Sequence, residues 1–143
     1  MTDELISRIL VATDGSENNR PALDEGIKIA RAFGATVYAV YVIDIGTFSS
    51  MSGDIPIGDT YQIFHAEAEQ AFAHIKSLAG DVKVETMVRQ GHPAAEVVKL
   101  AVAQKIDLIV IGTQGKKGLE RLLLGSVAEE IIRSAPCKVL VVK

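Results

Sequence analysis

The chain has no tryptophan, one cysteine and few aromatic residues, which make up 5% of its 143 positions. The single cysteine, Cys137, cannot form a disulfide within the chain, and its place at the start of an apolar segment favours a buried, inert thiol. The shortage of aromatic side chains and a formal net charge of −3 leave neither stacking platforms nor a basic field for nucleic acid. We therefore expect no nucleic-acid binding.

Long hydrophobic segments are also missing. The longest uninterrupted apolar run, residues 37–43, is far shorter than the ~20 residues that a membrane-spanning helix needs. The acidic residues that follow Met1 lack the basic and apolar regions of a secretory signal. The sequence thus predicts a cytoplasmic protein with no membrane partner.

Hydrophobic residues as a class are plentiful, at 48% of the chain. A chain of this length can bury one sizeable core but is too short for two comfortable domains, so we expect one domain over residues 1–143. Apolar or alternating segments predict strands at 6–12, 36–43, 82–88, 108–111 and 137–142. Helical spacing between them predicts four helices, marked by Leu23, Ile27, Ala30 and Phe33, by Phe64, Ala68, Ala71, Ile75 and Leu78, by Ala94, Val97 and Ala101, and by residues 127–134.

This alternation of strand and helix predicts an α/β fold. We expect a single doubly wound domain whose five-stranded parallel sheet carries helices on both faces, joined by right-handed crossovers. The helical pattern starts and stops at proline and glycine signals, with Pro21 and Pro93 in first turns and Gly34 after the first helix. Residues 45–59 read as a long loop, a pattern that does not distinguish a lid or partner surface from a mobile connection.

Glycines follow the fourth predicted strand at a distinctive spacing. Gly112, Gly115 and Gly125 are separated by two and then nine residues, and Ser126 comes next. Glycine permits φ > 0 and lets a ligand approach main-chain N–H groups. Ser126 to Glu129 has the pattern of a capping box, which predicts a helix start whose unpaired N–H groups attract anions. The pattern predicts a phosphate-binding loop.

Two familiar phosphate motifs are excluded by spacing. A P-loop requires Gly-Lys followed by Ser or Thr, whereas Gly115 is followed by Lys116 and Lys117. A dinucleotide fingerprint requires G-x-G-x-x-G directly after the strand, whereas Gly112, Gly115 and Gly118 are spaced G-x-x-G-x-x-G. Lys116, Lys117 and Arg121 could neutralise phosphate or simply belong to a solvated loop.

The spacing Gly-x₂-Gly-x₉-Gly-Ser is that of the adenine-nucleotide motif of the universal stress protein family. Further segments agree with the family in the same order: 9–16, 41–44, 91–93, 122–127 and 135–142. The chain therefore resembles the nucleotide-binding, UspA-like branch of that family over essentially its whole length. The resemblance implies the strand order 3-2-1-4-5 and a role in the stress response, often as a dimer.

In a doubly wound sheet, ligands bind beyond the carboxyl ends of the strands where the strand order reverses. Asp14 could contact ribose or adenine, or hold Mg²⁺ or Mn²⁺ beside phosphates, or merely form a turn. The resemblance implies main-chain contacts to the base. The expected nucleotide-binding residues are Ala12, Thr13, Asp14, Val42, Gly91, Ile111, Gly112, Gln114, Gly115, Gly125, Ser126 and Val127, with Asp14 as the metal ligand. Among the histidines, His65 and His74 are expected on a helix surface and His92 beside the pocket.

The expected function is regulatory binding of ATP or AMP in the stress response with little or no turnover, because the sequence shows no catalytic constellation. Two positions depart from the family pattern: Gln114 stands where many members have His, and Ala128 where some have a hydroxyl. These departures leave the choice between ATP and AMP open. The alternatives are a slow ATP-hydrolysing or nucleotidyl-transferring enzyme and a nucleotide-independent dimeric scaffold.

The last predicted strand also suggests a partner. Val139 to Val142 is apolar on both faces and, in the implied order, lies at an exposed sheet edge. We expect a homodimer paired through this strand, as the family resemblance also implies, and a further protein partner is compatible with a regulatory role.

Overall fold

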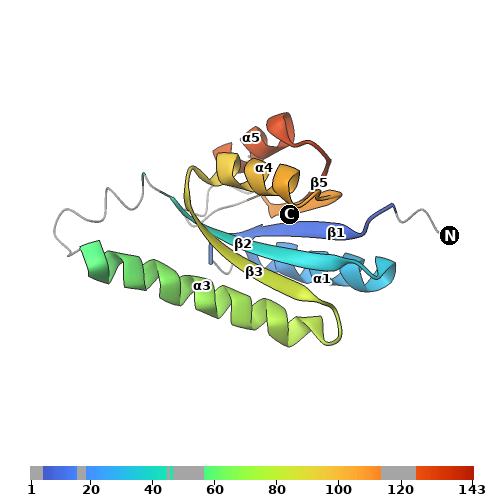
Figure 1. Ribbon diagram of the computed structural model, residues 1–143, viewed down its shortest axis with the longest axis horizontal. Coiled ribbons are helices and arrows are strands. Elements are labelled where there is room, and N and C mark those ends of the chain that lie inside the picture. Colours follow the sequence, from blue (N-terminus) through green and yellow to red (C-terminus); the bar gives the residue numbers. More distant parts are fainter. Residues whose placement is uncertain (1–4, 16–18, 45, 47–56, 114–124) are drawn as a thin grey trace.

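The computed structural model describes residues 5–15, 19–44, 46, 57–113 and 125–143. Their five strands form one parallel sheet in the order β3-β2-β1-β4-β5, which confirms the predicted fold class (Figure 1). The strands are β1 (Arg8–Thr13), β2 (Thr36–Asp44), β3 (Val84–Gly91), β4 (Leu108–Gly112) and β5 (Lys138–Val142). The reversal of strand order falls between β1 and β4, because β2 and β3 lie on one side of β1 while β4 and β5 lie on the other.

Four helices in the described ranges form two layers, one on each face of the sheet (Figure 1). The layer of α1 (Arg20–Phe33) and α3 (Ile57–Ala79) covers one core, and the layer of α4 (Pro93–Ala103) and α5 (Ser126–Ser134) covers the other. Alternation along each strand divides its side chains between the cores, so that Val11 packs in the first and Leu10 in the second. No helix in these ranges is long and apolar enough to cross a membrane.

Helix α1 approaches β1 closely at Gly26. A Cβ at this position would lie 2.5 Å from Cγ2 of Val11, so a larger residue would push the helix off the sheet. The helix ends at Gly34 in the left-handed conformation (φ +68°), with the Gly34 N–H bonded to the Ala30 carbonyl. Phe33, predicted on the apolar face, is instead 45% exposed, because it belongs to the last turn beyond the buried positions.

Helix α3 begins at Ile57, inside the segment predicted as a loop, so that prediction was wrong for 57–59. Its buried positions include Phe64, Ala68 and Ile75 as expected. Leu78, predicted on the apolar face, is 37% exposed, and Ala79 is buried instead. Successive residues of a helix are rotated by 100°, so in the last turn it is Ala79 that points toward the core. Strand β3 runs to Gly91 rather than stopping at 88.

Candidate functional site

The carboxyl ends of β1 and β4 lie side by side at the point where the strand order reverses. The two strands pair in register from Ile9 opposite Leu108 to Val11 opposite Val110, and they end at Thr13 and Gly112. This geometry brings Ala12 and Thr13 together with Ile111 and Gly112, although the two pairs are far apart in the sequence. It is the place where doubly wound folds bind ligands.

The two ends of the glycine motif are joined by a main-chain hydrogen bond. The Gly125 N–H donates to the Thr113 carbonyl at 3.1 Å, and the Thr113 N–H donates to the Val142 carbonyl at 3.2 Å. The first turn of α5 is thereby held beside the end of β4. Its leading N–H groups, at Ser126, Val127 and Ala128, precede the first intrahelical bond, which the Glu129 N–H makes to the Gly125 carbonyl at 3.0 Å. Such groups and the helix dipole favour an anion.

The predicted capping box at this helix is wrong. Gly125 is the N-cap residue, with extended φ −66° and ψ 157°, and no side chain bonds the cap. Ser126 is already the first helical residue, so its hydroxyl lies one position too late for the box. Glu129 instead accepts a hydrogen bond from Arg133 at 2.9 Å along the exposed face of α5. Consequently the exposed Ser126 side chain is not engaged in capping its own helix.

The turn after β1 is held by Thr13, a role that the sequence did not reveal. The Thr13 side chain is buried, and its Oγ1 accepts a hydrogen bond from the Gly15 N–H at 3.1 Å. Gly15 has φ +80°, a conformation that favours glycine. Asp14 lies between these two residues and is half-buried, at the carboxyl end of β1. The turn thus presents the Asp14 carboxylate at the same end of the sheet as the glycine motif.

The other predicted site residues are farther from this centre. Val42 lies near the end of β2 and packs toward the α4 and α5 layer, opposite Arg89 of β3. Gly91 ends the edge strand β3, opposite Asp44, so β2 separates it from β1. The exposed His92 follows it as the N-cap residue of α4. Gln114, Gly115 and the cationic residues of the motif, Lys116, Lys117 and Arg121, lie outside the described residues.

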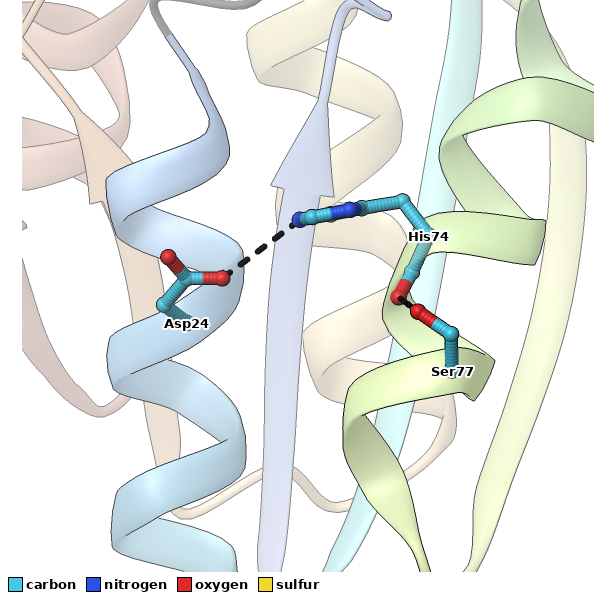
Figure 2. A network of polar contacts seen from close by, with 3 residues as sticks. All are labelled: Asp24, His74 and Ser77. Atoms are coloured by element: carbon cyan, nitrogen blue, oxygen red, sulfur yellow. Dashed lines mark hydrogen bonds and ion pairs between the residues drawn. The ribbon is translucent and has the colours of Figure 1, made fainter.

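A polar contact between α1 and α3 lies close to the turn after β1. His74 points from α3 toward Asp24 on α1, with 3.5 Å between Nε2 and Oδ1, and the Ser77 hydroxyl donates to the His74 carbonyl at 2.6 Å (Figure 2). The prediction that His74 lies on the surface was therefore wrong, because its side chain is half-buried between the two helices. His65 is also half-buried, and its ring centroid lies 4.5 Å from that of the exposed Tyr61. Beside His74 is a cavity of about 30 Å³, room for one water molecule, lined by Thr13, Gly15, Arg20, Leu23, Gln70, Ala71 and His74.

Tyr41 and Glu67 form a second contact that sequence reasoning missed. Tyr41 is 1% exposed, and its hydroxyl donates a hydrogen bond of 2.7 Å to Oε2 of Glu67 on α3. Burial raises the pKa of Tyr41, and the hydrogen bond and negative charge of Glu67 and the charge of Asp14 raise it further. The phenol therefore stays protonated at neutral pH and remains a donor. The sequence offers one indication of this contact, since Glu67 directly precedes Ala68 at the border of the apolar stripe of α3.

The strand order and the helix layers define a doubly wound α/β domain, and the candidate site lies at its topological switch point. The chain belongs to the universal stress protein family, whose family model matches residues 6–143. It is 42% identical over 143 residues to the universal stress protein MJ0531 of Methanocaldococcus jannaschii, covering 99% of this chain and 84% of that protein.

Solved structures agree with this assignment. The universal stress protein UspA from Lactobacillus plantarum superposes with a TM-score of 0.85 at 26% identity, covering 96% of this chain and 98% of that one. A universal stress protein in complex with cAMP superposes with a TM-score of 0.70 at 28% identity, covering 96% of both chains. Thus at least one protein of this fold and family binds an adenine nucleotide.

Proposed function

We propose that the protein binds ATP or AMP as a regulatory protein of the stress response and turns the nucleotide over slowly or not at all. The observation that carries this proposal is the hydrogen bond from Gly125 to the Thr113 carbonyl. It holds the positive end of α5 at the switch point, beside the ends of β1 and β4, where phosphates bind in such folds. The cAMP complex of a related protein supports the same ligand class.

In this proposal the phosphates contact main-chain N–H groups around Gly112, Gly125, Ser126 and Val127. The sequence motif adds Gln114 and Gly115 to the same loop. The base and ribose lie against Ala12, Thr13, Asp14 and Val42, while Ile111 and Gly91 complete the boundary of the pocket. Because most of these contacts use main-chain atoms, side-chain identity matters less than the path of the backbone.

The residues present fit a divalent cation that arrives with the nucleotide. No group of three or more His, Cys, Asp or Glu in the described ranges is placed to hold a metal by itself. Asp14 supplies one hard carboxylate oxygen, and Mg²⁺ or Mn²⁺ typically binds through one or two carboxylates together with substrate phosphates. When bound, the cation would neutralise phosphate charge, and Asp14 would hold it beside the β1 turn.

We further propose that the protein forms a homodimer through β5. This strand is at the edge of the sheet, and its Leu140 side chain is 36% exposed. Val127 and Ile132 are also exposed, on the helix α5 that packs against β5. An unpaired apolar edge strand presents both main-chain bonding groups and side chains to a second copy.

Nucleotide binding can be tested directly. We expect adenine nucleotide to copurify with the protein, and calorimetric titration to detect ATP or AMP binding to the stripped protein. Gly125→Val places a branched side chain beside the Thr113 carbonyl and should weaken binding about tenfold or more, a loss of ~1.4 kcal/mol. Gly58→Val is the matched control, because a Cβ at Gly58 meets nothing within 4 Å. A wild-type protein that binds neither nucleotide would refute the proposal.

A further inference from the structure

The hydrogen bond between Tyr41 and Glu67 lies directly beside the β1 turn. Tyr41 is paired in register with Thr13, the last residue of β1, and its side chain points into the α1 and α3 layer. Glu67 lies near the middle of α3 and reaches the Tyr41 hydroxyl at 2.7 Å. The bond therefore ties the long helix α3 to the strand that flanks the site.

Both residues also lie close to the turn itself. A Cβ built on Gly15 would lie 3.2 Å from Cε2 of Tyr41, 3.4 Å from Cβ of Glu67 and 3.6 Å from the Glu67 carbonyl. The Tyr41 ring and α3 at Glu67 thus lie beside the exposed Gly15 and leave little room for a side chain there. On the other side, Thr13 Oγ1 holds the Gly15 N–H. The main chain on either side of Asp14 is fixed by these contacts.

The strand alternation separates this support from the proposed ligand. Tyr41 faces the core beneath α1 and α3, whereas its neighbour Val42 faces the core beneath α4 and α5. Tyr41 can therefore influence the nucleotide through the backbone of the turn that carries Asp14. Because Tyr41 is buried and keeps its proton, its hydroxyl is a constant donor to the Glu67 carboxylate.

We infer that Tyr41 and Glu67 are positioning residues of the nucleotide site, whose hydrogen bond fixes α3 against the β1 turn and so sets the placement of Asp14. This inference rests on the proposed nucleotide binding and assigns to it two residues outside the glycine motif. It also makes α3 part of the site's supporting structure, since any shift of α3 along the sheet would move the surface beneath Gly15.

Four variants test the pair by calorimetric titration with ATP and Mg²⁺. A hydrogen bond to a charged group contributes enough that losing it should weaken ATP binding on the order of three- to tenfold in both Tyr41→Phe and Glu67→Ala. The double variant should bind no more weakly than the single ones, since both remove the same bond. Glu67→Gln keeps an acceptor oxygen and should restore near wild-type affinity. Tyr38→Phe is the control, because Tyr38 is buried in the opposite core.

A ligand-free readout separates this inference from the proposed function. Amide hydrogen exchange at Gly15 should speed up in Tyr41→Phe and Glu67→Ala, and stay unchanged in Glu67→Gln and Tyr38→Phe. If the wild type binds nucleotide but the pair variants match it in affinity, the positioning role is overturned and the binding proposal stands, whatever the exchange rates. If the wild type binds no nucleotide, both are overturned. Additive losses of ATP affinity in the double variant would also overturn the inference, because the two side chains would then act independently.

Discussion

Ser7 donates two hydrogen bonds to one oxygen of Asp107, from its backbone N–H and from its hydroxyl, both at 2.9 Å. The Arg8 N–H donates a third to the same Oδ2 at 2.9 Å, and the Asp107 N–H returns a bond to the Arg8 carbonyl. This cluster joins the start of β1 to the residue before β4, at the end of the sheet opposite the proposed nucleotide site. These hydrogen bonds thus hold β1 and β4 together at the end of the sheet where no ligand is expected.

The Asp107 cluster predicts a pH-dependent stability. Burial raises the pKa of Asp107, but the hydrogen bonds from Ser7 and Arg8 and the charge of Arg8 outweigh it, so the net pKa is lowered. A lowered carboxyl pKa contributes stability that is present above the unfolded value, near pH 4, and is lost as the pH falls through the folded value. Asp107→Ala should lower the free energy of unfolding by about 2 kcal/mol at pH 7. In this variant the urea midpoint should also fall less steeply than in the wild type as the pH drops below about 4. An equally steep fall of the midpoint in variant and wild type would contradict the role given to Asp107.

The close approach of α1 to β1 predicts that Gly26→Ala is destabilising. Its Cβ would lie 2.5 Å from Val11 Cγ2, and relieving that overlap should cost about 1–3 kcal/mol. Gly58→Ala, in the open first turns of α3, should instead stabilise by about 0.5–1 kcal/mol. Thermal unfolding of both variants gives the comparison, and a neutral Gly26→Ala would mean that α1 can move freely.

The proposed dimer predicts that Leu140→Lys yields a monomer. Leu140 is exposed on β5, whereas Val139 and Val141 pack partly against the second core, so the substitution charges the edge without disturbing the fold. Light scattering at micromolar concentration should show a dimer for the wild type and a monomer for the variant. Val102→Lys on α4, where Val102 is 62% exposed, is the control and should remain dimeric.

The proposed site predicts ATP turnover below about 1 s⁻¹, the low end of ordinary enzyme rates. Phosphoryl transfer needs a placed cation for the developing charge, and a well-placed arginine contributes ~10³–10⁵-fold in GTPases. None of the described residues that we assign to the site is lysine or arginine. A steady-state assay with Mg²⁺ or Mn²⁺ decides the matter, and faster turnover would favour the enzyme over the regulator.

The role proposed for Asp14 predicts a loss of metal dependence. Removing Mg²⁺ with a chelator should weaken ATP binding to the wild type, because the cation joins the phosphates to the Asp14 carboxylate. In Asp14→Ala the affinity for ATP should be low and nearly independent of Mg²⁺. AMP offers fewer phosphate oxygens to a cation, so its binding should respond less. Equal Mg²⁺ dependence in variant and wild type would remove Asp14 as the metal ligand.

The strands and the fold class were predictable because buried parallel strands are continuous apolar runs, as at Leu108 to Ile111. The strand order came from the family resemblance, since no local pattern specifies which strands are neighbours. The placement of Asp14 and Gly112 at the carboxyl end of the sheet followed from the predicted strand ends, whereas Ala12 and Thr13 were assigned from the family resemblance. The strands and the strand ends were predictable for one reason, which is that each depends on residues adjacent in the sequence.

The failures were local ambiguities or distant contacts. Ser126 to Glu129 has the residues of a capping box, yet the helix starts so that Gly125 takes the capping position. The contact between Tyr41 and Glu67 joins side chains 26 positions apart, and nothing in either segment identifies its partner. His74 reads as a surface residue because polar side chains recur along α3, and only the packing of α1 gives it Asp24 as a neighbour.

The hydrogen bond between Gly125 and Thr113 has a consequence for sequence divergence. It fixes the two ends of the segment 114–124 to each other through main-chain atoms, so the anchor does not depend on which side chains lie between. For a segment with fixed ends, doubling the length adds only ~0.6 kcal/mol of closure entropy. Chain entropy therefore sets little limit on the length of this segment, and we expect relatives to differ in it while β4 and α5 keep their places.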